Sequence, residues 1–430
     1  MPERHEPASP LHILIVIDNF HPLIGGAEHA ALESGRALAA RGHRVDVLTM
    51  RKSRDWPPEE QLESLRVFRF NERVPPRPFG RLLYERANAN AARRYLDERL
   101  AEPPYDLILL HPIDAAFGVI RSRVAARAAV IYCFHAPLGE EHWLHVRGMT
   151  GEDTPFLSRW ARFFAAGRTA RYRAAQQRAA IERADALTCP SEYSRDLLSE
   201  TVPHLGCKRV QVIPWGVDAA RFRPAADRAA LRAALGWGPD ELVLFTARRL
   251  VPRMGVGQLI RGFGLAAPRQ PNLRLVIAGD GPLRGRLEAL AQRAGGRIGF
   301  AGLVPPDDLP RYLQAADLFV LPSLALEAFG LVTLEALACG TPVLATQRCA
   351  SPEILAPLDE RLLIPGSDAA AIAEGILRAG VEVAAEPGFR DRCRAYVVEH
   401  YSWERTAAAF EEVAHQLLQG TAKMRMQSAE

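Results

Sequence analysis

Two glutamates stand eight positions apart in an otherwise apolar and small-residue stretch, LALEAFGLVTLEALACGTPVLA at residues 324–345. They are Glu327 and Glu335, and a Phe-Gly pair lies between them. The preceding ADLFVLPS is typical of a buried strand that ends near Ser323, and GLVTLEALACG is typical of a short helix closed by Gly340. We therefore expect Glu327 in the loop before the helix and Glu335 about one turn inside it.

The start of this helix predicts a site for a phosphate or a diphosphate. The first amides of a helix have no partner within it, so the N–H groups from Gly330 to Val332 would point unpaired into a cleft. A diphosphate repels carboxylates, which favours neutral hydroxyl groups beside Glu327 and Glu335. Hydroxyl pairs of a ribose and a hexose would suit them. The alternative is that one glutamate balances the helix dipole and the other is a surface charge.

Two other segments carry residues that suit the same chemistry. Gly25 and Gly26 begin a predicted helix after the first strand, where absent side chains would let a phosphate or sugar approach the backbone. This is not the GxGxxG pattern, so a nicotinamide site is not indicated. Arg248, Arg249 and Arg253 follow another predicted strand, and guanidinium groups there would suit a diphosphate or would be solvated loop charges.

A histidine ends a further predicted strand in the segment VIYCFHAPLGEEHW. His135 would be a structural residue in most settings, but at the interface of a two-domain enzyme it is a candidate for the reaction centre. The six cysteines contain no CxxC pair, so we expect reduced thiols and no metal site.

Length and composition indicate a two-domain globular protein. The chain has 430 residues, of which 48% are hydrophobic and 24% charged, and a net charge of +4 gives little reason to expect nucleic-acid binding. Since the chain lacks a run of about 18 apolar residues and an apolar signal core near its start, we expect neither a membrane span nor secretion. The expected location is the cytoplasm, or the inner face of the membrane as a peripheral protein.

Short apolar runs alternate with helical patterns throughout, which predicts an α/β fold of two doubly wound parallel sheets facing a cleft. Ligands in such sheets bind beyond the carboxyl ends of the strands. The expected strands are Leu11–Ile17, Val45–Thr49, Leu65–Phe70, Leu107–Leu110, Val130–Phe134 and Ala186–Thr188 in the first half, and Leu242–Thr246, Leu273–Ala278, Ile298–Ala301, Leu318–Leu321, Val343–Ala345 and Leu362–Ile364 in the second.

The predicted organisation has a Pro- and Gly-containing connection near residue 214. Residues 1–10 and 420–430 would be tails. Residues 11–213 and residues 214–400 would form two Rossmann-like domains, and residues 401–419 would form a C-terminal helix that starts after the N-cap Ser402.

Taken together, these motifs make the sequence resemble the large family four of retaining nucleotide-sugar glycosyltransferases, also described as glycosyl transferases group 1, which have the GT-B fold. The resemblance covers nearly the whole chain, and its most specific part is residues 316–346. The segments that carry it are GGAE from Gly25, His135, PSEYS at 190–194, IPWGVD at 213–218, RRLVPRMG at 248–255, AGDGP at 278–282, AGLVPPDDLPRYLQAAD from residue 301 and the Glu327/Glu335 pair.

The resemblance implies a role for each of these residues. Glu327 would contact the donor sugar, Glu335 would bind the ribose, Arg249 would bind the diphosphate, and His135 would lie near the reacting sugar. Gly26 would line the phosphate site and the backbone around Gly302 would read the base. The sugar and diphosphate would be held by the amides of Phe329, Gly330, Leu331 and Val332. The resemblance also implies that residues 11–213 form the acceptor-side domain, that residues 214–400 form the nucleotide-sugar-binding domain, and that the C-terminal helix returns to the first domain. Members of the family retain the anomeric configuration and need no metal or other cofactor.

The chain departs from the family pattern at two positions. The family loop reads Arg-Leu-x-x-x-Lys-Gly, but the lysine position is Met254, and the chain's three lysines, Lys52, Lys208 and Lys423, offer no replacement in the second domain. Arg253 or Arg248 could supply the missing charge. Alternatively, the protein is a weakened copy that binds a partner or a nucleotide-sugar without turnover. The second departure is Trp215, where the family more often has asparagine.

The expected donor is a UDP- or GDP-linked hexose, and the acceptor is a hydroxyl of a glycan, a lipid-linked molecule or a metabolite. No nucleic-acid partner is expected. An arginine series with interleaved aromatic residues runs from Arg159 to Arg183. It predicts either an interfacial helix on an anionic membrane or a solvated helix face.

Overall fold

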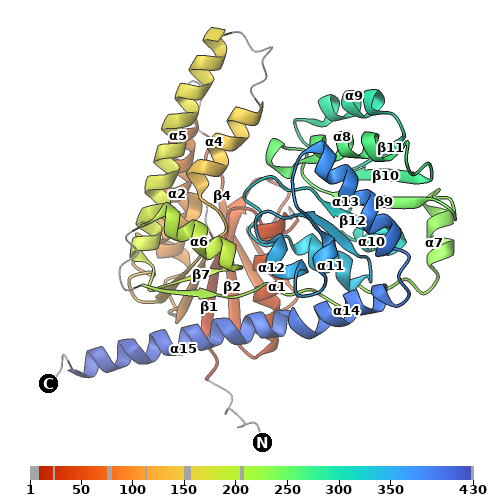
Figure 1. Ribbon diagram of the computed structural model, residues 1–430. Helices are drawn as coiled ribbons and strands as arrows, with labels where there is room; N and C mark the ends of the chain where they lie inside the picture. The colour runs from red at the N-terminus through yellow and green to blue at the C-terminus, as the bar shows by residue number, and fades with distance from the viewer. Residues whose placement is uncertain are drawn as a thin grey trace, which may run out of the picture.

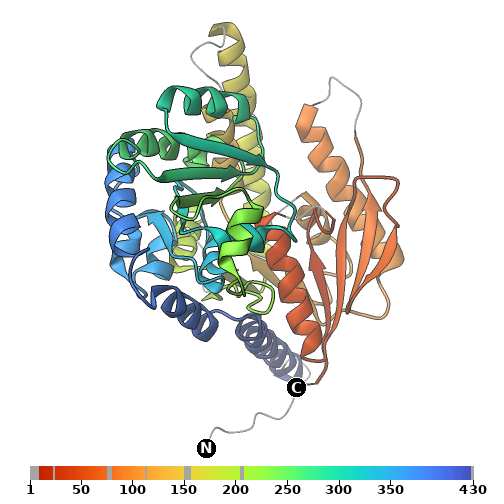
Figure 2. The same cartoon turned by 90° about the vertical axis from the view of Figure 1, so that its right-hand side faces the viewer.

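The computed structural model describes residues 9–22, 25–74, 80–111, 114–149, 156–203 and 208–427. Its two parallel sheets lie side by side, each flanked by helices (Figure 1), and the view at right angles shows the second half packed against the first helix of the chain (Figure 2). The predicted α/β fold of two doubly wound halves is confirmed. Most of the expected N-terminal tail, residues 1–8, lies outside the described residues. Cys207 also lies outside them.

The first sheet has the strand order β3-β4-β2-β1-β5-β6-β7-β8, and β3 alone runs antiparallel to its neighbour, among the described residues. All six strands expected in this half are present, but the short and polar β3 and β8 were not expected. The strands are β1 His12–Val16, β2 Arg44–Arg51, β3 Glu59–Leu62, β4 Leu65–Asn71, β5 Leu107–Leu110, β6 Ala129–Cys133, β7 Ala186–Cys189 and β8 Arg209–Val212.

The second sheet has the order β11-β10-β9-β12-β13-β14, with every pairing parallel. Its central strands β9 and β12 place their carboxyl ends next to each other, which is where a ligand is expected in such a sheet. The strands are β9 Leu242–Ala247, β10 Leu273–Ala278, β11 Arg297–Gly302, β12 Leu318–Leu321, β13 Val343–Thr346 and β14 Leu363–Ile364.

Strand β1 shows why the first sheet is covered on both faces. Its side chains alternate, so that Leu14 and Val16 pack with α2, α3, α5 and α6, whereas Ile13 and Ile15 pack with α1 and α15. The helices of this half are α1 Gly26–Ala40, α2 Gly80–Arg99, α3 Asp114–Val119, α4 Leu138–Met149, α5 Phe156–Arg183 and α6 Glu192–Thr201.

The second half has its own core, built around β9, β10 and β12 and covered by α8, α11 and α13. Its helices are α7 Arg228–Ala234, η1 Pro252–Met254, α8 Val256–Ala266, α9 Arg284–Ala294, α10 Leu309–Ala315, α11 Leu331–Ala338, α12 Ser351–Leu355, η2 Glu360–Leu362, α13 Ala369–Glu382, α14 Phe389–His400 and α15 Trp403–Gln427. Helix α15 returns to the first sheet, as expected, and continues past the predicted end at 419.

The two chain crossings between the halves lie against each other. A Cβ on Gly216 would come within 2.2 Å of the Trp403 backbone nitrogen, so only glycine allows this approach. The Val217 N–H donates to the Tyr401 carbonyl at 3.2 Å, and the Thr406 hydroxyl donates to the Pro214 carbonyl at 2.8 Å. These contacts make the connection a packed pair of segments.

Candidate active site

A buried ion pair joins the carboxyl ends of β9 and β12. Arg248 follows β9 and donates from Nη2 to Oε2 of Glu327, which lies in the loop after β12. The Ser323 hydroxyl donates to the same oxygen at 3.0 Å. Burial by itself would raise the pKa of Glu327, but Arg248, then Arg253, and the Ser323 hydroxyl outweigh it and lower the pKa below its usual value. Glu327 is therefore a carboxylate at neutral pH.

Met254 packs against this ion pair. It is 6% exposed, and its Sδ lies 2.7 Å from Nη2 of Arg248. The chain turns sharply after it, because Gly255 has φ 71° and a Cβ there would meet the Pro322 carbonyl at 1.7 Å. The position where the family has lysine thus holds an apolar side chain that borders the Arg248 guanidinium.

Arg253 is occupied elsewhere. Its Nη1 donates to the Leu326 carbonyl at 3.0 Å, and its Nη2 donates to Oε1 of Glu141 on α4 at 2.8 Å. Arg249, the residue expected to bind the diphosphate, is 68% exposed at its side chain and lies 3.7 Å from the same Glu141 oxygen. Of the three arginines in this loop, Arg248 is the one in contact with Glu327.

Two buried donors at this point have no partner among the described residues. They are Nη1 of Arg248 and the Thr333 hydroxyl, on residues that are 8% and 1% exposed. Thr333 is in the first turn of α11, whose N-cap Gly330 has φ 81°, and the amides of Leu331 and Val332 are the first two of the helix. Unpaired donors beside a helix N-terminus fit an anionic group with several oxygen atoms.

His135 lies after β6 and faces other aromatic rings. Its Nε2 is 3.0 Å from Nδ1 of His111, and its ring lies 5.2 Å from that of Trp215, which in turn lies 5.6 Å from the Phe329 ring. Burial lowers the pKa of His135 to about 4, so the imidazole is neutral at pH 7. Trp215, marked in the sequence only as a departure from the family, therefore lies between His135 and the loop after β12. This loop, residues 322–330, is called the donor loop here because its Glu327 is expected to contact the donor sugar.

Glu335 is in α11 and meets the first half of the chain at α1. Its Oε1 lies 3.8 Å from Nε2 of His29. Burial, with Glu33 acting in the same direction, raises the pKa of Glu335 to about 7, although Arg221 opposes the shift. Burial, then nearby arginines, lowers the pKa of His29 to about 4. Between these values both groups are mainly neutral, so the contact is not an ion pair in that range.

The raised pKa of Glu335 gives a pH dependence that can be measured. The unfolded chain ionises this carboxyl near 4.5, whereas the folded protein keeps it protonated up to about 7. Stability from this group is therefore fully present below 4.5 and is lost as the pH rises to 7, by up to about 3 kcal/mol. We expect Glu335→Gln to lose less stability than the parent protein between pH 4.5 and 7.5, measured by thermal unfolding.

Glu399→Gln, at an exposed carboxyl on α14, is the matched control and should follow the parent curve. If the Glu335→Gln and parent curves are parallel over this range, Glu335 does not titrate as described.

Two of the glycines expected at the site, Gly25 and Gly26, lie one turn before His29 in α1. Gly25 is the N-cap of α1, where its N–H donates to Oε2 of Glu28 at 3.1 Å. A Cβ on Gly26 would meet nothing within 4 Å. Gly302, with φ 72°, ends β11, and its carbonyl accepts from the Gly279 N–H at 2.6 Å.

Further contacts across the halves were not expected from the sequence. The hydroxyls of Ser191 and Ser194 donate to the Ala328 carbonyl at 2.6 Å and 3.0 Å. The first amides of α6, those of Glu192 and Tyr193, donate to the Glu353 carboxylate at 2.8 Å and 2.6 Å. The PSEYS motif thus holds the donor loop in place, and its N-cap serine was the sequence signal.

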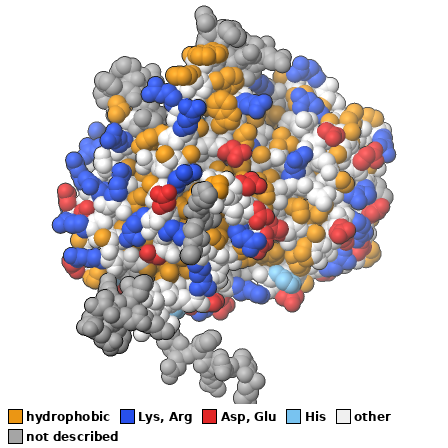
Figure 3. All heavy atoms as spheres, turned by 60° about the vertical axis from the view of Figure 1, so that its left-hand side comes forward, with side chains coloured by type: hydrophobic (Ala, Val, Ile, Leu, Met, Phe, Trp, Pro, Cys, Tyr) orange, Lys and Arg blue, Asp and Glu red, His pale blue; other side chains and the backbone are white. Residues whose placement is uncertain are grey.

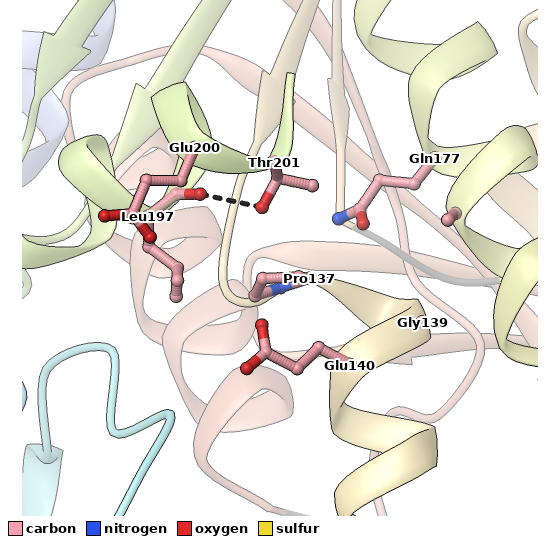
Figure 4. Close-up of a pocket in the computed structure, with 8 residues that line it drawn as sticks. Pro137, Gly139, Glu140, Gln177, Leu197, Glu200 and Thr201 are labelled. Atoms are coloured by element: carbon pink, nitrogen blue, oxygen red, sulfur yellow. Dashed lines mark hydrogen bonds between the residues drawn. The ribbon is translucent and has the colours of Figure 1, made fainter. Parts of the chain in front are cut away.

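A cavity of about 350 Å³ opens in the first half, beside the loop that follows His135. Figure 4 shows Glu140 from α4 and Glu200 from α6 at this space, with Gln177 of α5 across from them. Gln177 is fully engaged, since it donates to the Tyr132 hydroxyl and the Ala136 carbonyl and accepts from the Leu138 N–H. The cavity therefore has a fixed amide on one side and two carboxylates on the other.

Within the described part of the chain, no three His, Cys, Asp or Glu side chains gather as a metal site would require, and the five described cysteines are free thiols. No described helix combines the length and apolar composition needed to cross a membrane.

The chain is similar to curated relatives over part of its length. The D-inositol 3-phosphate glycosyltransferase of Streptomyces bingchenggensis is 33% identical over 261 residues, which are 57% of this chain and 56% of that protein. The GDP-mannose-dependent monoacylated alpha-(1-6)-phosphatidylinositol monomannoside mannosyltransferase of Corynebacterium glutamicum is 33% identical over 200 residues, 45% of this chain and 52% of that protein. The chain thus spans about half the length of these relatives.

A solved structure and two family descriptions extend the comparison to nearly the whole chain. Sucrose-phosphate synthase from Thermosynechococcus elongatus has the same fold, with a TM-score of 0.76 at 24% identity over 95% of this chain and 100% of that chain. Residues 24–221 match Glycosyltransferase Family 4, and residues 227–396 match Glycosyl transferases group 1. The chain therefore has the GT-B fold and belongs, through these two matches, to the family-four group of glycosyltransferases.

Proposed function

We propose that the protein is a retaining hexosyltransferase that moves a hexose from a UDP- or GDP-sugar to a hydroxyl group of a glycan, a lipid-linked molecule or a small metabolite. The observation that carries the proposal is the buried Arg248–Glu327 pair, in which Nη1 of the guanidinium has no partner among the described residues and lies in the same site as the α11 N-terminus. This arrangement suits a diphosphate next to a sugar.

The donor would lie along the carboxyl ends of β9 and β12. Arg248 and the first amides of α11 would bind the diphosphate, and Glu327 would accept hydrogen bonds from sugar hydroxyls. Glu335 would bind the ribose after its contact with His29 opens. Arg249, exposed beside Glu141, can turn toward the diphosphate. The base would lie near Gly302, and Gly25 and Gly26 would border the phosphates from the first half.

The chemistry would rely on charge stabilisation. The bond between the anomeric carbon and the diphosphate oxygen breaks, and the acceptor oxygen bonds to the same face of that carbon, which retains the configuration. The departing phosphate takes the acceptor proton. Arg248 and the helix N-terminus stabilise the charge that develops on the diphosphate, so the proposal needs no metal ion or other cofactor. The neutral His135 would lie near the reacting sugar and can donate a hydrogen bond to it.

The relatives support the donor and acceptor classes without fixing either. One is named for GDP-mannose and a phosphatidylinositol mannoside, and the other for D-inositol 3-phosphate. The cavity beside Glu140 and Glu200 is in the acceptor-side half and would suit the hydroxyl groups of such an acceptor.

The test is donor binding and hydrolysis by the purified protein over a panel of UDP-, GDP- and ADP-sugars, with and without EDTA. We expect one donor to bind selectively and to turn over slowly at a rate that EDTA does not change. Product configuration, read by NMR from transfer to a simple alcohol, should match that of the donor. Inverted product, or turnover that EDTA abolishes, would contradict the mechanism, and failure to bind any donor would contradict the site.

A further inference from the structure

The α4–α5 pair projects beyond both sheets. Figures 1 and 2 both show the start of α5 rising above the rest of the molecule. The two helices are packed firmly together, because the Trp143 and Phe163 rings lie 5.7 Å apart and a Cβ on Gly139 would meet the Ala170 carbonyl at 2.6 Å. The projection is therefore a rigid part of the first half.

One stripe of α5 lies beside the side that packs on α4, and it carries two exposed aromatic rings. Trp160 and Phe164 are 64% and 59% exposed, and their rings are stacked 6.0 Å apart with an angle of 4° between planes. They are one helical turn apart, and the same stripe continues through Arg168, Arg171 and Arg178 at helical spacing. Two adjacent exposed aromatic rings are typical of a surface that contacts a partner or a membrane.

Almost all charged residues of α5 are positive. The helix contains seven arginines and one acidic residue, Glu182. Arg173 pairs with Glu85 and Arg183 lies near Asp185, but the three stripe arginines make no ion pair within the described chain. Figure 3 shows hydrophobic and basic side chains together in the upper part of the face that it presents.

We propose that this stripe, defined by Trp160, Phe164, Arg168, Arg171 and Arg178, docks on the surface of an anionic lipid bilayer. Aromatic rings insert at the headgroup level, and arginines beside them bind lipid phosphates. A single bilayer surface therefore suits both the aromatic and the basic residues of the stripe. A nucleic acid would match the arginines, but the net charge of the whole chain is only +4. Charge complementarity together with the aromatic end of the projection favours the bilayer.

The α4–α5 pair also connects the docking stripe to the proposed active site. Helix α4 begins at Leu138, directly after the His135 loop, and its Glu141 binds Arg253 of the second half. The cavity at Glu140 and Gln177 lies between the α4–α5 pair and α6. If the proposed transferase function holds, the acceptor would be a lipid-anchored hydroxyl compound presented from the bilayer.

Docking can be measured without any sugar nucleotide, so its outcome is independent of the proposed activity. Purified protein is sedimented with vesicles of phosphatidylcholine alone and with vesicles that contain about 30% phosphatidylglycerol. We expect binding to the anionic vesicles only, and its loss at about 0.5 M NaCl.

Two double variants separate the aromatic and the basic contributions to vesicle binding. Trp160→Ser with Phe164→Ser, and Arg168→Glu with Arg171→Glu, should each lower the partition coefficient by at least about 30-fold, since each basic contact and each buried ring contributes severalfold. The matched controls are Leu265→Ser with Val398→Ser, at exposed apolar residues, and Arg286→Glu with Arg293→Glu on α9. They should bind like the parent protein, and all variants should unfold at the parent temperature.

Equal binding to neutral vesicles, no binding to either, or equal loss in the α9 control would overturn the proposal. A dimer in light scattering that Trp160→Ser with Phe164→Ser dissociates, without vesicle binding, would assign the stripe to a second copy of the chain. Binding to tRNA that exceeds binding to anionic vesicles would assign it to nucleic acid.

Discussion

Glu327→Gln is expected to lower kcat by about 10²- to 10³-fold, the effect of removing one preorganised polar group from a reaction centre. Glutamine keeps the shape of the side chain but removes the charge that Arg248 faces. The guanidinium then stays buried without its counter-ion, and removal of one partner from such a pair costs about 3–5 kcal/mol of stability. Steady-state kinetics with the active donor and thermal unfolding measure the two effects.

A destabilised control separates folding from chemistry. Asp317→Asn removes one partner of another inward-facing pair in the same half, in which Asp317 accepts from Arg232 at 2.8 Å. We expect this variant to unfold at a lower temperature and to keep kcat within about threefold at 20 °C. Equal kcat losses in Glu327→Gln and Asp317→Asn would mean that Glu327 acts through stability alone.

The second large effect is expected when the positive charge at position 248 is moved to position 254. Arg248→Met should lower kcat by about 10²-fold, because the leaving diphosphate loses a charge-assisted contact. Met254→Lys should also lower activity, since its ammonium group would enter the space 2.7 Å from the guanidinium and place two cations beside one carboxylate. The double variant has one cation again and should recover kcat to within about tenfold of the parent protein.

This exchange distinguishes the two hypotheses about Met254. Recovery in the double variant would give a large favourable coupling energy between the two positions, in a cycle of four proteins. If Met254→Lys alone raises turnover and Arg248→Met has no effect, the protein is a weakened copy and Arg248 does not serve the leaving group. Arg261→Met, at an exposed position of α8, is the control for loss of positive charge in this half and should keep the parent kcat.

The sheets followed from local patterns. All twelve expected strands are present because apolar runs of four to eight residues between turns have few alternatives in an α/β chain. The two missed strands, β3 and β8, are four residues long and carry polar side chains, EEQL and RVQV, so neither shows the apolar run. Their pairing comes from an edge position next to β4 and β7, which a local pattern does not encode.

The sequence by itself determined where the donor loop ends, where the helix after it begins, and which glutamate lies in each. The spacing of Glu327, Gly330 and Glu335 predicted one carboxylate before the helix and one inside it, because strand ends and helix starts are set by residues close in the chain. Only the tertiary structure decided which cation meets Glu327. Arg248 and Arg253 are in one short loop, and the strand register beside β12 directs the first inward, whereas Glu141 from the other half holds the second.

Contacts between the halves were likewise decided by the fold. Glu353 reaches the amide of Tyr193 across 160 positions of the chain, His29 meets Glu335 from another helix, and Trp215 lies between His135 and Phe329. Burial at these contacts raises the pKa of Glu335 and lowers that of His135. The residue types were visible in the sequence, but desolvation depends on which surfaces pack together, and that is a property of the assembled chain.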